Sequence, residues 1–95
     1  MNAGYQVEIG AKAQRELATI IRGDKRRAVV LKQGLLDLAQ DPRPEGCRKL
    51  SGPYDLYRIR ISVYRIIYRV SDSTITVTVV RVAHRGSAYT GLDNL

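Results

Sequence analysis

The 95-residue chain is long enough for one domain with a single modest core, and too short for two. It carries 16 lysines and arginines against nine acidic residues, and this net charge of +7 favours a polyanionic partner, either nucleic acid or an acidic protein. A single cysteine, Cys47, excludes an intramolecular disulfide, and a single histidine, His84, excludes a histidine-rich metal site. We therefore expect chemistry without a metal or cofactor.

The chain contains no apolar run of membrane-spanning length, and its N-terminus lacks the apolar segment of a signal peptide. We therefore expect a cytoplasmic protein. The positive charge has a simpler interpretation, which is a soluble basic surface without a polyanionic partner. The clustering of arginines on one predicted strand face, described below, argues against that interpretation.

The first forty residues predict one strand and two helices. Residues 5–9 alternate apolar and polar side chains as a strand does. Apolar residues then recur at helical spacing over 11–22 and again over 25–40, with Asp24 as the N-cap of the second helix. Gly34 lies inside that second helix and weakens it by about 1 kcal/mol relative to alanine.

The rest of the chain predicts three strands. Residues 45–55 contain several glycines and prolines, which are typical of a loop or an irregular strand. Two alternating strands follow between Tyr54 and Arg69, and their connection at Ser62–Val63 lacks the residues of a tight hairpin turn. After a turn at 71–73, a last strand covers 74–82.

The last predicted strand is apolar on both faces near its end. Ile75, Val77 and Val79 point one way, and Val80 and Val82 add apolar groups to the other face. This pattern is typical of a strand at the centre of a sheet. Because neither helix can bury its apolar stripe alone, we predict an α+β fold of order β-α-α-β-β-β, with two helices on one face of a small, largely antiparallel four-stranded sheet.

The strand pair in the middle of the chain predicts an arginine-rich sheet face. Its alternation puts Arg58, Arg60 and Arg65 on one face, and three guanidinium groups this close repel one another unless an anion lies among them. We therefore expect a phosphate site there; a solvated face or a surface for an acidic partner is the alternative. The opposite face is apolar and phenolic, and we assign it to the core: Tyr57, Ile59, Ile61, Tyr64, Ile66, Tyr68 and Val70.

If the anion is RNA, cleavage without a metal can use the substrate's own 2′-hydroxyl as the nucleophile. Arginines suit the neutralisation of charge on the phosphoryl oxygens, and Arg85 adds a further one just past the last strand. They carry protons poorly because they stay protonated, which leaves His84 and Tyr89 as proton carriers. The alternatives are a structural histidine at the strand end, and a tyrosine that packs the tail or stacks on a base.

An ordered set of motifs resembles the RelE toxins of bacterial and archaeal toxin–antitoxin pairs, over nearly the whole chain. The motifs are Lys49-Leu50-Ser51-Gly52, Tyr57-Arg58-Ile59-Arg60-Ile61, Tyr64-Arg65-Ile66-Ile67-Tyr68, and Val82-Ala83-His84-Arg85 with Tyr89 four residues on. The resemblance implies a single RelE-like domain over 1–95 that enters the ribosomal A site, cuts messenger RNA by 2′-hydroxyl attack and halts translation. It also implies neutralisation by a RelB-like antitoxin, with the free toxin a monomer.

The resemblance assigns roles to residues of this chain. It implies catalytic roles for Arg58, Arg60, Arg65, Arg85 and Tyr89, with His84 as a further candidate, and RNA contacts for Lys49, Arg58, Arg60 and Arg65.

The chain also departs from the RelE pattern. Some RelE proteins have lysines where this chain has Arg58 and Arg60, so the identity of the general base is open. Val63 stands where a glycine is usual, before Tyr64. One alternative function is that of the related ParE toxins, which share the fold but inhibit DNA gyrase without cutting RNA. The other is a basic RNA-binding module without turnover.

Overall fold

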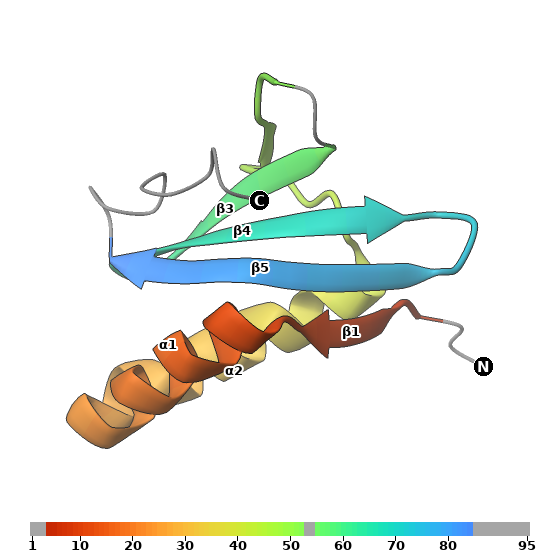
Figure 1. Cartoon of the computed structure of the whole chain (residues 1–95). Coiled ribbons are helices and arrows are strands. Elements are labelled where there is room, and N and C mark those ends of the chain that lie inside the picture. The colour runs from red at the N-terminus through yellow and green to blue at the C-terminus, as the bar shows by residue number, and fades with distance from the viewer. Residues whose placement is uncertain (1–3, 53–54, 85–95) are drawn as a thin grey trace.

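The computed structural model describes residues 4–52 and 55–84, which form two helices and one sheet (Figure 1). The predicted α+β class is confirmed, and so are the two helices. The elements are β1 (Gln6–Ile9), α1 (Ala11–Gly23), α2 (Lys25–Gln40), β2 (Arg48–Lys49), β3 (Leu56–Ile61), β4 (Tyr64–Ser71) and β5 (Thr76–His84).

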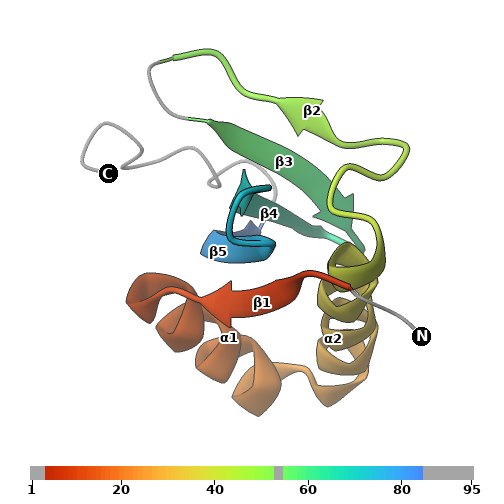
Figure 2. The ribbon, with the colours of Figure 1, turned by 90° about the vertical axis from the view of Figure 1, so that its right-hand side faces the viewer.

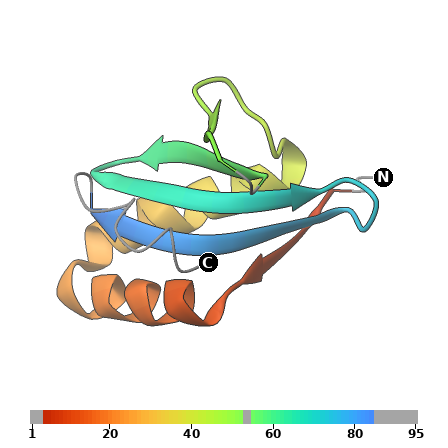
Figure 3. The ribbon, with the colours of Figure 1, turned by 45° about the horizontal axis from the view of Figure 1, so that its top comes forward.

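The sheet has five strands in the order β1-β5-β4-β3-β2. β1 runs parallel to β5, and all other neighbouring strands are antiparallel. The additional strand, β2, has only two residues and lies in the stretch that the sequence predicts as a loop or irregular strand. Both helices lie on one side of the sheet (Figure 2), and β3, β4 and β5 run side by side in alternating directions (Figure 3).

A local sequence signal marks the start of α2. The predicted N-cap is confirmed, because the Asp24 carboxylate accepts a hydrogen bond from the backbone N–H of Arg27 at 3.1 Å. The structure explains why a glycine stands at position 34 in the middle of α2: a Cβ there would collide with the side chain of Ile61 in β3. The glycine therefore lets the helix approach the sheet closely. In the described part of the chain, no helix is long and apolar enough to cross a membrane.

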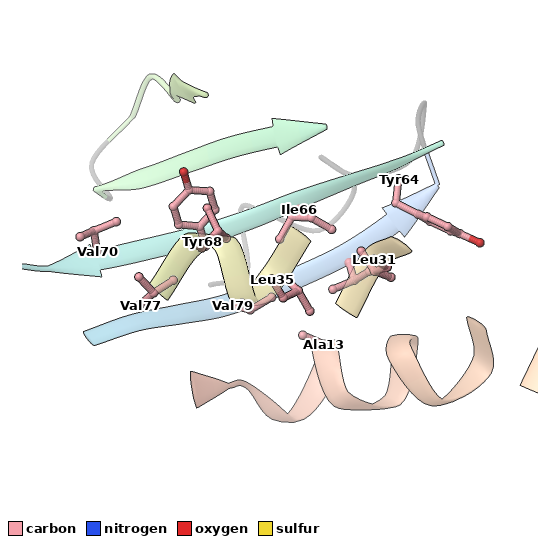
Figure 4. Packing of buried hydrophobic residues seen from close by; sticks show 11 residues of the cluster. Ala13, Leu31, Leu35, Tyr64, Ile66, Tyr68, Val70, Val77 and Val79 are labelled. Atoms are coloured by element: carbon pink, nitrogen blue, oxygen red, sulfur yellow. The ribbon is translucent and has the colours of Figure 1, made fainter. Parts of the chain in front are cut away.

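The core lies between the helices and the face of the sheet that they cover (Figure 4). The assignment of the tyrosines to this face is confirmed: Tyr64 and Tyr68 belong to the core, and Tyr57 stacks on Tyr68 with ring centroids 5.8 Å apart. Burial of Tyr68 raises the pKa of its phenol, whose hydroxyl donates to the Pro42 carbonyl at 2.8 Å. The buried members of the core are Ala13, Leu31, Leu35, Leu38, Tyr64, Ile66, Tyr68, Val70, Val77, Val79 and Val82.

Two predicted orientations in the last strand are wrong. Ile75 lies in the turn before β5, with a positive φ of 52° and 48% exposure, so it does not face the core. Val82 lies on the same face as Val79, because a β-bulge pairs Tyr68 with Val79 but Ile67 with Arg81. The extra residue in the bulge reverses the alternation beyond it. β5 is nevertheless a central strand, as predicted, with β1 and β4 as its neighbours.

The connection between β3 and β4 is a two-residue hairpin turn at Ser62–Val63, since Ile61 and Tyr64 are directly paired. Ser62 takes the positive φ, at 59°, while Val63 does not. A positive φ at the first central residue alone is the sign pattern of a type II′ turn. Val63 is therefore compatible with the turn, and the backbone strain falls on Ser62.

A network of polar side chains ties distant segments together at the far end of β4. The Arg43 guanidinium donates two hydrogen bonds, of 3.2 and 3.0 Å, to the Asp72 carboxylate. The Nε of Arg43 donates a third, of 3.0 Å, to the Tyr57 hydroxyl. Tyr5 donates to the same carboxylate at 2.7 Å. The hydrogen bonds from Arg43 and then Tyr5 lower the pKa of Asp72, and the bond to Asp72 raises the pKa of Tyr5.

Candidate nucleic-acid interface

The register of the sheet gathers arginines on the face turned away from the helices. Arg60 lies directly opposite Arg65, and Arg48 directly opposite Arg58, so each pair shares a face. Arg69 lies on the same face further along β4, opposite Leu56. The three arginines that the alternation singles out thus lie together, with Arg48 as an additional neighbour.

Arg58 is buried without a compensating charge. It is 8% exposed, its Nε has no hydrogen-bond partner, and no carboxylate pairs with it within residues 4–52 and 55–84. Arg81 gives the contrast: it is 6% exposed, but its Nε lies 3.1 Å from the carboxylate of Glu16, which also accepts from the Val82 N–H. A buried cation is costly unless an anion faces it. Arg81 has its anion within the fold, whereas Arg58 does not.

A groove of about 830 Å³ lies between the 45–51 segment and β3. Its charged lining consists of four cations, Arg48, Lys49, Arg58 and Arg60, and one carboxylate, Glu45. Its other lining residues are Gly46, Leu50, Ser51 and Ile59. The surplus of cations gives the groove a positive potential suited to a polyanion.

Lys49, predicted to contact RNA, lines this groove, and its Nζ is 3.3 Å from the Asp55 carboxylate. Both side chains are well exposed, so the pair contributes little to stability and leaves Lys49 available to a ligand.

His84 lies apart from the arginine pairs. It is paired with Tyr64, which faces the helices, and its ring meets the Tyr64 ring edge-on with centroids 6.2 Å apart. The neighbouring Ala83 is the residue opposite Arg65. His84 is therefore near the same end of the sheet as Arg65 but on the other face. Arg85 and Tyr89 lie outside the described residues.

Sequence analysis missed Arg48 as a candidate. A two-residue strand is too short to show alternation, so the pattern that reveals Arg58 and Arg60 is absent around Arg48. The adjacent basic pair Arg48–Lys49 was the only available signal. Within the described residues, no group of three or more histidine, cysteine and acidic side chains is placed to hold a metal ion.

The fold and this surface define a small, basic α+β protein with an arginine-lined sheet face. Comparison with known proteins agrees on the family. The model for the ParE toxin of the type II toxin–antitoxin system parDE matches residues 7–89. The toxin RelG of Mycobacterium tuberculosis is 31% identical over 88 residues, which cover 90% of this chain and 95% of RelG. The mRNA interferase toxin RelE of Escherichia coli is 34% identical over 80 residues, covering 82% and 77%.

Comparison with solved structures also points to this family. The archaeal RelE–RelB complex from Pyrococcus horikoshii contains a chain that superposes with a TM-score of 0.75 at 27% identity, covering 90% of this chain and 99% of that one. The chain therefore belongs to the family of type II toxin–antitoxin toxins that includes RelE and ParE.

Proposed function

We propose that this toxin is a metal-independent endoribonuclease that cleaves messenger RNA in the ribosomal A site. The observation that carries the proposal is Arg58, a buried guanidinium without a carboxylate partner in the described structure, beside the facing pair Arg60 and Arg65. Such a surface suits a scissile phosphate, whose charge grows as the 2′-hydroxyl attacks. Two relatives named mRNA interferases, both 34% identical, support the same activity.

The arginines would share one task in this reaction. Arg58, Arg60 and Arg65 stabilise the charge on the phosphoryl oxygens, and Arg85 joins them in the proposal. The 2′ proton and the leaving 5′ oxygen require a proton carrier, for which we propose Tyr89. His84, the other candidate from the sequence, packs against Tyr64 on the opposite face of the sheet, so we do not assign it this role. Lys49 contacts the RNA beside the reaction centre.

The decisive test is primer extension on messenger RNA from programmed ribosomes exposed to the purified protein. Wild-type protein should give cuts at A-site codons with no metal beyond the Mg²⁺ that holds the ribosome together. Arg65→Ala should slow cleavage roughly 30- to 1,000-fold, since an electrostatic contact to the reacting group is worth about 2 to 4 kcal/mol. Arg69→Ala is the matched control, because Arg69 lies on the same strand and face but away from Arg60. Equal rates for the two variants would refute the role of Arg65.

We further propose a RelB-like antitoxin as the partner and the cytoplasm as the site of action. The solved neighbours include chains in RelE–RelB and RelBE toxin–antitoxin complexes. The first observation to make is whether a short acidic reading frame lies next to this gene; its co-expression should restore growth and yield a complex that survives gel filtration.

A second candidate is inhibition of DNA gyrase, favoured by the match to the ParE family model. Pulse-labelling of growing cells separates the two functions. Prompt loss of protein synthesis supports ribosomal action, whereas early loss of DNA synthesis with strand breaks supports gyrase.

A further inference from the structure

The groove beside β3 exists because β2 is much shorter than its neighbour. β2 has two residues and β3 has six, so β2 pairs only with Tyr57 and Arg58. Ile59 and Arg60, which lie beyond the end of β2, line the groove. The groove therefore runs along the edge of β3 from Arg48 to Arg60, which lies directly opposite Arg65 of β4.

We propose that this groove holds the backbone of single-stranded RNA, with Arg48 binding the phosphate next to the scissile one and Arg58 lying between the two phosphates. This inference rests on the proposed function, because it takes Arg58, Arg60 and Arg65 as the reaction centre. It adds a binding residue, Arg48, that lies outside the motifs shared with RelE.

The register supplies the spacing for two successive phosphates. The Arg48–Arg58 pair and the Arg60–Arg65 pair lie two residues apart along β3, which is roughly 7 Å. Successive phosphates of an extended single strand are separated by a similar distance. Like charges directly opposite each other destabilise a sheet, so the Arg48–Arg58 pair is favoured by an anion between its two members.

The burial of Arg58 points to a ligand rather than to a solvated charge. A guanidinium that is 8% exposed and lacks a carboxylate in the described structure has lost most of its water, while the facing Arg48 is exposed and adds a second positive charge. Arginine forks bind phosphate through two parallel hydrogen bonds, which replace the lost hydration.

The lining of the groove, more than its size, favours RNA over an acidic peptide. Its volume of about 830 Å³ lies in the range of ligand-binding clefts and admits either. Leu50 and Ile59 add apolar walls on which a ribose or a base can pack.

The test measures binding without cleavage. The probe is a fluorescein-labelled hexanucleotide with 2′-O-methyl groups, which cannot be cut by 2′-hydroxyl attack, and binding is followed by anisotropy from 50 to 300 mM salt. Arg48→Gln should reduce the slope of log affinity against log salt by about 0.7, the value for one phosphate contact on a single strand. Arg69→Gln, which removes the same charge from the same face outside the groove, should leave the slope unchanged.

Arg48→Lys keeps the charge, so it should retain the wild-type slope while weakening binding, because lysine lacks the bidentate fork. Equal slope changes for Arg48→Gln and Arg69→Gln would overturn the proposal. So would displacement of the probe by hexaglutamate at a similar concentration with the same dependence on Arg48, since the groove would then be a site for acidic peptide. If Arg48→Gln lowers the slope but wild-type protein does not cut messenger RNA on ribosomes, RNA binding in the groove is supported and the nuclease proposal fails.

Discussion

The two buried arginines of the sheet should respond in opposite ways to the same substitution. Methionine has a similar length and no charge, so Arg58→Met removes a buried cation that has no carboxylate partner within the described structure, whereas Arg81→Met breaks an ion pair with Glu16. Arg58→Met should raise the free energy of unfolding, because it removes a desolvation penalty. Arg81→Met should lower it, because it leaves a carboxylate without its cation.

The expected magnitudes follow from burial and partners. Leaving a buried polar group unsatisfied costs about 1–3 kcal/mol, so Arg58→Met should raise the free energy of unfolding by about 1–2 kcal/mol. Breaking a buried pair costs about 3–5 kcal/mol, but Glu16 is 21% exposed and keeps its bond from the Val82 N–H, so we expect a loss of about 2–3 kcal/mol for Arg81→Met.

The assay is urea unfolding followed by circular dichroism. With a slope of about 1.2 kcal/mol per molar urea for a chain of this size, the midpoint should rise by about 1 M for Arg58→Met and fall by about 2 M for Arg81→Met. The stabilised Arg58→Met variant should also lose cleavage activity, because functional charges are commonly kept at the expense of stability. A comparable loss of stability for both variants would refute the reasoning, since Arg58 would then be a structural residue.

Two further predictions concern the packing of α2 and the network at Asp72. Gly34→Ala should destabilise the fold by about 1–2 kcal/mol in the same urea assay despite better helix propensity, because the new methyl meets Ile61; adding Ile61→Val should recover part of the loss. Asp72→Asn should lower Tm at pH 7, and its deficit against wild type should shrink as pH falls below about 4. The pKa of Asp72 is lowered by Arg43 and Tyr5, so its contribution is present above the unfolded value and lost on acidification; a deficit that stays constant down to pH 2.5 would contradict this.

The sequence by itself determined the class of fold and the arginine face. Alternation in β3 and β4 is a local property of the chain, and it correctly separates Arg58, Arg60 and Arg65 from the tyrosines of the core. The helices could also be predicted from the sequence, because helical periodicity and the Asp24 cap depend on residues only a few positions apart.

Only the tertiary structure decided the features that depend on pairing between distant segments. The bulge opposite Ile67 turns Val82 to the core, and the two-residue β2 brings Arg48 opposite Arg58; neither leaves a periodic signal in the sequence. Whether a buried arginine has a carboxylate partner also depends on tertiary contacts, because Glu16, the partner of Arg81, lies 65 residues away in α1. A charge is encoded locally, but whether it is neutralised depends on which segments the fold brings beside it.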